Sequence, residues 1–273
     1  MREIGGVFKR LKDQGDGALI AYIMCGDPKP EYTPKIARAL IQGGVDILEL
    51  GLPFSDPIAD GPTIQAAGVR ALKAGTTPKK VLEIAKQIKD EHHIPIAIMT
   101  YYNPVFRMGL DVFFRSARNC GVDGVIVPDL PVDEAQDYKK TAETYGIDTI
   151  FLAAPSTSVK RLRKIVEFTS GFLYLVSTLG VTGERATVQN STVELIKKCK
   201  PYTAKRIPLA VGFGISTEGH VETVIRSGAD GAIVGSTFVN IVNRNQGNQE
   251  RMLEELEAKA RALKASTRLI GSS

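Results

Sequence analysis

The sequence predicts a protein of the α/β class, a (β/α)8 TIM barrel formed by a single domain over residues 1–273 with extra N-terminal and C-terminal helices. Eight apolar, β-rich runs follow one another with helical segments between most of them, and most starts lie twenty-odd residues apart, the length of one strand plus one helix. No linker-like stretch divides the series, and 273 residues is an ordinary length for one such barrel. The same alternation leaves a doubly wound open sheet as the alternative.

The predicted strands are the apolar runs themselves. They are Ala18–Gly26, Val45–Pro53, Pro95–Asn103, Gly124–Asp129, Asp148–Pro155, Gly171–Thr178, Pro208–Gly214 and Gly231–Ser236. Helical segments such as Glu31–Ile41 and Thr77–Glu91 lie between them. The amphipathic segment Gln249–Ala265 is expected to form a helix that packs on the outside of the barrel.

A short phrase of glycine, an apolar residue and aspartate recurs between a helical segment and the next run. The four copies are Gly44-Val45-Asp46, Gly121-Val122-Asp123, Gly146-Ile147-Asp148 and Gly228-Ala229-Asp230. Glycine can close a helix in the left-handed conformation, and the aspartate then opens a strand. This is the rhythm of a parallel sheet whose strands are joined by helices, and such barrels place their active sites at the C-terminal strand ends.

Composition and charge exclude several function classes. The three cysteines, Cys25, Cys120 and Cys199, lie far apart, which argues against a disulfide framework or a zinc site and fits a reducing compartment. Neither a signal peptide nor an 18-residue apolar run is present, so we expect a cytoplasmic protein. The net charge is +5, and the basic residues cluster at 160–164 and 197–206, on predicted helices or the loops after them. We interpret these clusters as solvated helix faces and expect no nucleic acid partner.

Glu49 is the first candidate for chemistry. Alternation along the second run directs Val45, Ile47, Glu49 and Gly51 to one side, and we expect that side to face the inside of the barrel. A carboxylate among apolar residues loses hydration, which raises its pKa toward the range useful for proton transfer. The alternative is a buried glutamate held in a salt bridge.

The segment after this strand, Pro53–Pro62, carries two further carboxylates, Asp56 and Asp60. Its prolines and glycine stiffen a surface loop, and together with Glu49 the two aspartates form a carboxylate group at the active end of the barrel. The alternative is a capped turn in which one aspartate is the N-cap of a helix that starts near Thr63. Histidine is not expected to be the catalyst, because His92, His93 and His220 are predicted to be surface residues away from these carboxylates.

An anion site is predicted at the ends of the last two strands, in the stretches Gly212–Ser216 and Gly235-Ser236. Glycines there let backbone N–H groups approach an oxyanion, and the following helix N-terminus adds its dipole. Barrels of this kind often bind phosphate after strands seven and eight, and glycines at the matched ends of both strands favour a phosphate here. The motif lacks the third glycine of the dinucleotide fingerprint. The long loop Leu179–Arg185 is expected to act as a mobile lid, with an ordinary solvent loop as the alternative.

These residues resemble the signature of the tryptophan synthase α subunit family. The run Leu48–Gln65 carries most of the resemblance, and further matches extend it from about Phe8 to Leu263. Those matches are Tyr101-x-Asn103-Pro104, Pro128–Pro131, Gly180–Gly183, Gly212–Ser216 and Gly235-Ser236. The resemblance implies a lyase of tryptophan biosynthesis that splits indole-3-glycerol phosphate into indole and glyceraldehyde 3-phosphate. It implies no cofactor and no metal, and a tryptophan synthase β subunit as partner in an α2β2 complex.

The resemblance also implies roles for individual residues. Glu49 matches the acid–base catalyst and Asp60 the second catalytic carboxylate, while Asp56 and Thr182 would meet on loop closure. The phosphate would be held by Gly183, Gly214, Gly235 and Ser236. The substrate pocket would be lined by Tyr22, Met99, Tyr101, Tyr174 and Phe213. Tyr22, Met99 and Thr178 depart from the residues usual in the family, which bears on the tightness of the indole pocket.

Three other functions stay open beside this one. A free-standing lyase of the same family would turn over rapidly alone. A regulatory subunit with feeble activity would mainly activate its partner, although the presence of both Glu49 and Asp60 speaks against it. A sugar-phosphate isomerase on the same fold would release no indole.

Overall fold

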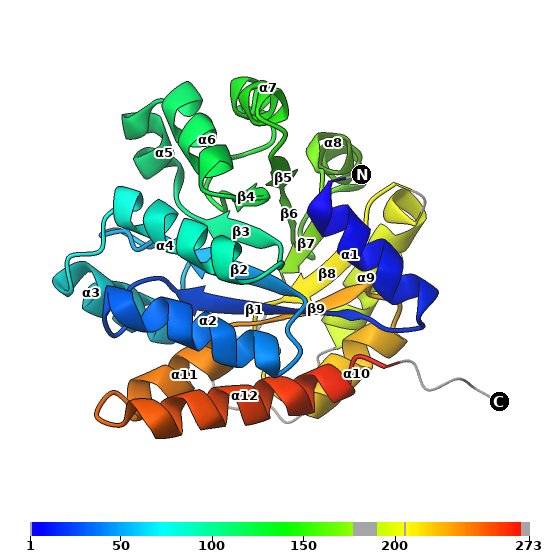
Figure 1. Cartoon of the computed structure of the whole chain (residues 1–273). Helices are drawn as coiled ribbons and strands as arrows, with labels where there is room; N and C mark the ends of the chain where they lie inside the picture. Colours follow the sequence, from blue (N-terminus) through cyan, green and yellow to red (C-terminus); the bar gives the residue numbers. More distant parts are fainter. Residues whose placement is uncertain (1, 177–189, 205, 269–273) are drawn as a thin grey trace.

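The structure is a computed structural model that describes residues 2–176, 190–204 and 206–268. Its strands are β1 (Ala18–Met24), β2 (Ile47–Gly51), β3 (Ile96–Met99), β4 (Gly124–Ile126), β5 (Asp148–Ile150), β6 (Leu152–Ala153), β7 (Leu173–Val176), β8 (Leu209–Gly212) and β9 (Gly231–Val234). All form one parallel sheet in the order β5-β4-β3-β2-β1-β9-β8-β7-β6. The two ends of this order, β5 and β6, are separated only by Phe151, so the sheet closes on itself as a barrel (Figure 1).

Each of the eight predicted runs contains a strand, which confirms the barrel and excludes the open sheet. The fifth run is divided because its two halves have different neighbours. Its first half pairs with β4 and its second half with β7, and the carbonyl of Phe151 between them accepts from the N–H of Tyr174 at 3.0 Å. The fifth strand therefore closes the barrel by changing its pairing partner at Phe151.

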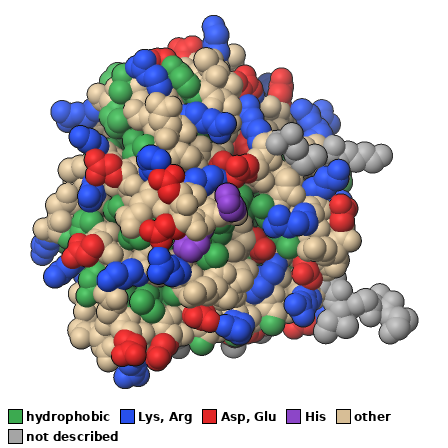
Figure 2. Space-filling view, viewed as in Figure 1, with side chains coloured by type: hydrophobic (Ala, Val, Ile, Leu, Met, Phe, Trp, Pro, Cys, Tyr) green, Lys and Arg blue, Asp and Glu red, His purple; other side chains and the backbone are tan. Residues whose placement is uncertain are grey.

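Helices surround the barrel (Figure 1). They are α1 (Glu3–Asp13), α2 (Thr33–Gln42) after a 3-10 turn (Pro30–Tyr32), α3 (Pro62–Lys73), α4 (Pro78–Glu91), α5 (Tyr102–Met108), α6 (Leu110–Asn119), α7 (Gln136–Thr144), α8 (Val159–Phe168), α9 (Asn190–Thr203), α10 (Glu218–Arg226), α11 (Ser236–Arg244) and α12 (Gln249–Ala265). The C-terminal helix α12 has the predicted bounds and packs outside the barrel against α2, α11 and α10. No helix in the described ranges is long and apolar enough to cross a membrane. Basic and acidic side chains are mixed across the face shown in Figure 2, as expected of solvated helix faces.

The recurring glycine phrase builds the same junction four times. Its glycine lies at positive φ in every copy, between 67° and 101°. The N–H of the next residue bonds back to the preceding helix, as from Val45 to the carbonyl of Leu40 at 3.1 Å, and this residue joins the apolar layer between helices and barrel. The prediction that Val45 points into the barrel is therefore wrong, because alternation begins only where β2 begins, at Ile47.

The aspartate of each phrase ties the N-terminal ends of the strands together. Asp46 accepts from the N–H of Leu19 and from Lys264, both at 2.8 Å. Asp123 and Asp230 make the same pair of contacts, to Ile96 with Lys89 and to Leu209 with Lys200. Each carboxylate thus caps the start of a neighbouring strand and is neutralised by a lysine.

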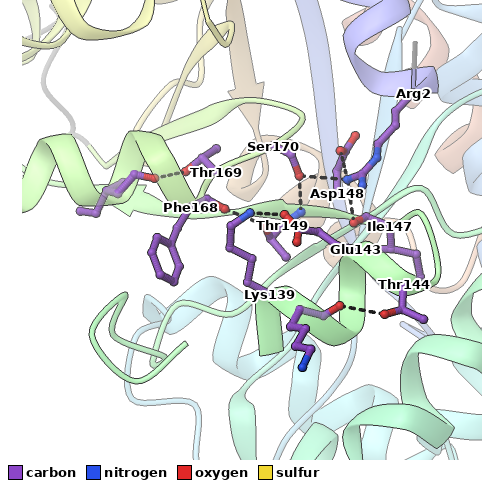
Figure 3. Close-up of polar contacts among 12 residues, drawn as sticks. Arg2, Lys139, Glu143, Thr144, Ile147, Asp148, Thr149, Phe168, Thr169 and Ser170 are labelled. Atoms are coloured by element: carbon purple, nitrogen blue, oxygen red, sulfur yellow. Dashed lines mark hydrogen bonds and ion pairs between the residues drawn. The ribbon is translucent and has the colours of Figure 1, made fainter. Parts of the chain in front are cut away.

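The aspartate of the fourth phrase, Asp148, forms an ion pair with Arg2, near the N-terminus of the chain (Figure 3). The Arg2 guanidinium donates to Asp148 at 2.8 Å, to the carbonyl of Ile147 at 3.0 Å and to Ser170 at 3.2 Å. Helix α1 then lays its apolar face over this end of the barrel, and Phe8 packs on Phe172 with ring centroids 5.7 Å apart. The N-terminal end is closed, so any site inside the barrel must open at the C-terminal strand ends.

Candidate active site

Glu49 lies inside the barrel near the C-terminal end of β2, level with Tyr22 of β1 and Ala97 of β3. Its neighbours on the strand behave as alternation predicts, because Leu48 and Leu50 join the outer apolar layer and Ile47 the inner one. The side chain is fully buried, and neither carboxylate oxygen has a hydrogen-bond partner among the described residues. Among the described residues Glu49 therefore forms no salt bridge, and the alternative prediction of a buried salt bridge is wrong there.

Burial without a partner sets the protonation of Glu49. Loss of hydration raises its pKa to about 8, and the charge of nearby Asp60 adds to the rise. The carboxyl group therefore carries its proton at neutral pH, and a group with a pKa near the working pH can both give and take a proton.

Asp60 lies on the segment after β2, just before α3. Partial burial raises its pKa to about 6, while a hydrogen bond from the Tyr101 hydroxyl works in the opposite direction. The same hydroxyl accepts from the N–H of Ala59 at 2.9 Å, and the backbone carbonyl of Asp60 accepts from Gln65 at 2.8 Å. These contacts fix the carboxylate near the barrel mouth, where it ionises before Glu49 does. Two carboxyl groups with separated pKa values can act as one acid and one ionised partner.

Neither aspartate of the segment Pro53–Pro62 caps α3. The N-cap is Gly61, which has no side chain to accept a bond, so the capped-turn alternative is wrong. Asp56 is exposed and bonds to the neighbouring Ser55. Its predicted partner Thr182 lies outside the described residues, as do Gly183, Thr178 and the predicted lid Leu179–Arg185.

A small cavity of about 10 Å³ adjoins Asp60. Three of the five predicted pocket residues line it, namely Tyr22, Met99 and Tyr101. The other two, Tyr174 and Phe213, pack on each other with ring centroids 5.9 Å apart and belong to the same inner apolar layer. A second cavity of about 490 Å³ lies at the ends of β4 and β6, between Val127 and Arg161.

The predicted anion site follows β8 and β9. Gly214 lies at φ 80° and the preceding Phe213 at φ 63°, so the turn after β8 has two successive left-handed residues. Gly235 is the N-cap of α11 and Ser236 its first residue. Among the described residues nothing accepts a hydrogen bond from the N–H of Gly214, Gly235 or Ser236. A Cβ on Gly235 would lie 3.2 Å from the Tyr22 ring, so this glycine lets the ring and the helix terminus come close together.

Sequence reasoning missed one residue of this end. His220 is not a surface residue, since only 5% of it is exposed. Its Nδ1 lies 3.1 Å from the carbonyl oxygen of Gly214. The sequence held a signal for this, because His220 shares a helical face with Val221, Val224 and Ile225, all of which are buried.

In the described ranges no group of three or more His, Cys, Asp or Glu side chains is arranged to hold a metal ion. Glu49 and Asp60 provide two carboxyl groups with raised pKa values, which suits acid–base chemistry.

Comparison with known proteins identifies the family of this chain. Residues 8–268 match the family described as tryptophan synthase alpha chain. The chain is 52% identical to the tryptophan synthase alpha chain of Methanosarcina acetivorans, over 97% of this chain and 93% of that protein. The crystal structure of the alpha chain from Legionella pneumophila has a TM-score of 0.90 at 33% identity and covers 100% of both chains. A chain of the tryptophan synthase α2β2 complex from Pyrococcus furiosus has a TM-score of 0.85 at 41% identity, over 91% of this chain and 98% of that one. The chain therefore belongs to the tryptophan synthase alpha chain family.

Proposed function

We propose that this chain catalyses the α reaction of tryptophan synthase, the cofactor-free cleavage of indole-3-glycerol phosphate into indole and glyceraldehyde 3-phosphate. The observation that carries the proposal is the pair of Glu49 and Asp60. Glu49 is fully buried, has no partner among the described residues and is protonated at neutral pH, whereas Asp60 is held by Tyr101 and ionises at lower pH. A retro-aldol cleavage needs one group of each kind.

The chemistry assigns a step to each carboxyl group. Protonated Glu49 gives its proton to C3 of the indole ring, and the ring nitrogen gains positive character. Ionised Asp60 stabilises that charge. Glu49, now a carboxylate, takes the proton of the hydroxyl on the carbon bonded to C3, a carbonyl forms, and the electrons of the breaking carbon–carbon bond return to the ring. One proton is given and one is taken, so Glu49 ends the cycle protonated.

The phosphate group is proposed to bind at Gly214, Gly235 and Ser236. Their N–H groups lack acceptors among the described residues, and the N-terminus of α11 presents the positive end of its dipole there. Tyr22 spans the distance between the phosphate site and the catalytic carboxyl group. Its ring lies against Gly235, and its hydroxyl lies against Gly51 on the strand that carries Glu49. The cavity beside Asp60 has about the volume of one water molecule, so the side chains that line it must move to admit an indole ring.

A tryptophan synthase β subunit is the proposed partner, in an α2β2 complex like that of the related Pyrococcus furiosus protein. Ile58 is 84% exposed on the segment that carries Asp60, and Phe106 is 68% exposed on α5. A partner that covers these side chains would remove their apolar surface from water, which favours association. Docking there would order the segment that positions Asp60 and pass indole to the β subunit. We further propose that residues 1–273 form one domain and that the protein works in the cytoplasm.

The test is to mix the purified chain with indole-3-glycerol phosphate and to measure indole release with and without a β subunit. We expect slow release by the chain alone and an acceleration of about 10- to 100-fold on adding the β subunit, as a coupling of 1–3 kcal/mol supplies. Fast release that the β subunit does not change would favour a free-standing lyase. Absence of indole release under both conditions would refute the proposal.

A further inference from the structure

The imidazole of His220 lies under the turn that follows β8. His220 belongs to the first turn of α10, where its N–H donates to the N-cap Thr217 at 3.2 Å. Its Nδ1 is 3.1 Å from the carbonyl oxygen of Gly214, 3.4 Å from the N–H nitrogen of Ser216 and 3.5 Å from the Ser216 hydroxyl. One ring nitrogen therefore meets three polar groups of a single turn.

These distances select one tautomer. The Gly214 carbonyl can only accept, whereas the Ser216 N–H can only donate, so these two contacts need opposite tautomers. The carbonyl is nearer, 3.1 Å against 3.4 Å, which favours a proton on Nδ1 that is donated to Gly214. The other ring nitrogen, Nε2, is buried and has no partner among the described residues. A bare lone pair is less costly in that position than an unpaired N–H, which again favours the tautomer with its proton on Nδ1.

The turn itself needs such a contact. Phe213 lies at φ 63°, where a residue with a side chain is strained and persists only if its surroundings hold it. Two side chains hold the turn from opposite ends. His220 binds the carbonyl of Gly214, and Thr237 of α11 donates to the carbonyl of Ser216 at 3.3 Å.

Holding a carbonyl also orients the neighbouring N–H groups. The C=O and N–H of one trans peptide point in opposite directions. When His220 draws the carbonyl of Gly214 toward α10, the N–H of the same peptide, that of Ile215, turns away from α10. The position of the preceding N–H, that of Gly214, is fixed by the same constraint on the Gly214 backbone.

We infer that His220 is a positioning residue of the phosphate-binding turn: its Nδ1–H holds the Gly214 carbonyl so that the N–H groups of the turn stay directed at the phosphate of a phosphate monoester. The inference rests on the proposed function only in its assignment of the phosphate to this turn. His220 does not touch the phosphate, and its effect passes through the Gly214 backbone.

The test is calorimetry of the full chain with glycerol 3-phosphate, and with indole as a ligand that lacks phosphate. His220→Leu keeps a similar volume and removes the donor, so we expect about tenfold weaker binding of glycerol 3-phosphate, the loss of roughly one hydrogen bond, with indole binding unchanged. His220→Asn places an amide N–H near the position of Nδ1 and should restore binding to within about threefold of wild type. Val224→Ala perturbs the same buried face of α10 without touching the turn and should bind glycerol 3-phosphate as wild type does.

Either of two results would overturn the inference: wild-type glycerol 3-phosphate affinity in His220→Leu, or an equal loss in Val224→Ala. If His220→Leu does not fold, nitrogen NMR of the wild-type ring decides, because a tautomer protonated at Nε2 cannot donate to Gly214. A wild type whose binding of glycerol 3-phosphate depends on His220 but that releases no indole would refute the proposed reaction and leave this inference intact. A wild type that releases indole but binds no glycerol 3-phosphate would refute the inference alone.

Discussion

Glu49→Gln should make the protein more stable at neutral pH while it abolishes most of the activity. The amide has nearly the shape of the protonated carboxyl group that the fold buries, but it does not ionise in the unfolded chain. In wild type the pKa of Glu49 rises from 4.5 in the unfolded chain to about 8 in the fold. A carboxyl group with a raised folded pKa destabilises the fold as pH rises above 4.5, and the effect levels off above about 8.

The size of the effect follows from those two pKa values. At pH 7 the glutamate is almost fully ionised in the unfolded chain and mostly protonated in the fold. This difference lowers the free energy of unfolding of the wild type by about 3 kcal/mol, and the glutamine variant does not have this loss. Near pH 4.5 the same difference falls below about 0.5 kcal/mol. Cleavage of indole-3-glycerol phosphate should fall by at least about 100-fold, because an amide cannot exchange the proton, while substrate affinity changes little.

Urea unfolding of both proteins at the two pH values measures the stability, and indole release measures the activity. The exposed Glu134→Gln is the matched control and should change stability by less than about 0.5 kcal/mol at either pH. If the Glu49 variant is no more stable than wild type at pH 7, Glu49 does not lose its charge on folding. If it retains wild-type turnover, Glu49 is not the proton shuttle.

Three further predictions concern the pH profile, the phosphate and the partner. The plot of kcat/KM against pH should be bell-shaped, because Asp60 must lose its proton near pH 6 and Glu49 must keep its proton up to about pH 8. A rate of indole release that stays constant from below pH 6 to above pH 8 would contradict the roles given to Asp60 and Glu49. Gly235→Asp should abolish the calorimetric heat of glycerol 3-phosphate binding, because the added charge repels phosphate and the added Cβ lies 3.2 Å from the Tyr22 ring. The fold should be little changed. Unchanged binding would place the phosphate elsewhere. Ile58→Asp should weaken association with a β subunit by at least about tenfold in a titration of activation, whereas Val112→Asp, 45% exposed on α6, should not; equal affinities would move the interface.

Local patterns predicted much of the fold. The recurring glycine phrase located four helix–strand junctions because positive φ strongly favours glycine and because the aspartate after it has a backbone N–H to cap. Alternation placed Glu49 inside because a strand has only two faces and helices cover one of them. Both arguments need only neighbouring residues.

The features that the sequence did not predict depend on how the helices and strands pack together and not on the local sequence pattern alone. Val45 was misplaced because its N–H still belongs to the end of α2, so the strand starts two residues later than the apolar run. The change of pairing partner at Phe151 depends on closure of the whole barrel. The sequence predicts a surface position for His220 because histidine is often exposed, whereas its face of α10 packs on the barrel and its ring reaches the turn before the helix. The volume of the cavity beside Asp60 depends on side chains from several strands and has no sequence signature.

Buried carboxyl groups have different surroundings at the two ends of the barrel, and the contrast supports the role proposed for Glu49. At the N-terminal end Asp46 and Asp123 each bind a strand N–H and a lysine, so their negative charge is compensated at every point of contact. At the C-terminal end Glu49 has no cation and no donor within the described residues. If burial of a carboxyl group served only packing, leucine would fill the space without the cost of about 3 kcal/mol at pH 7. A fold that pairs Asp46 and Asp123 with lysines and leaves Glu49 without a partner in the described ranges retains a proton that can be transferred.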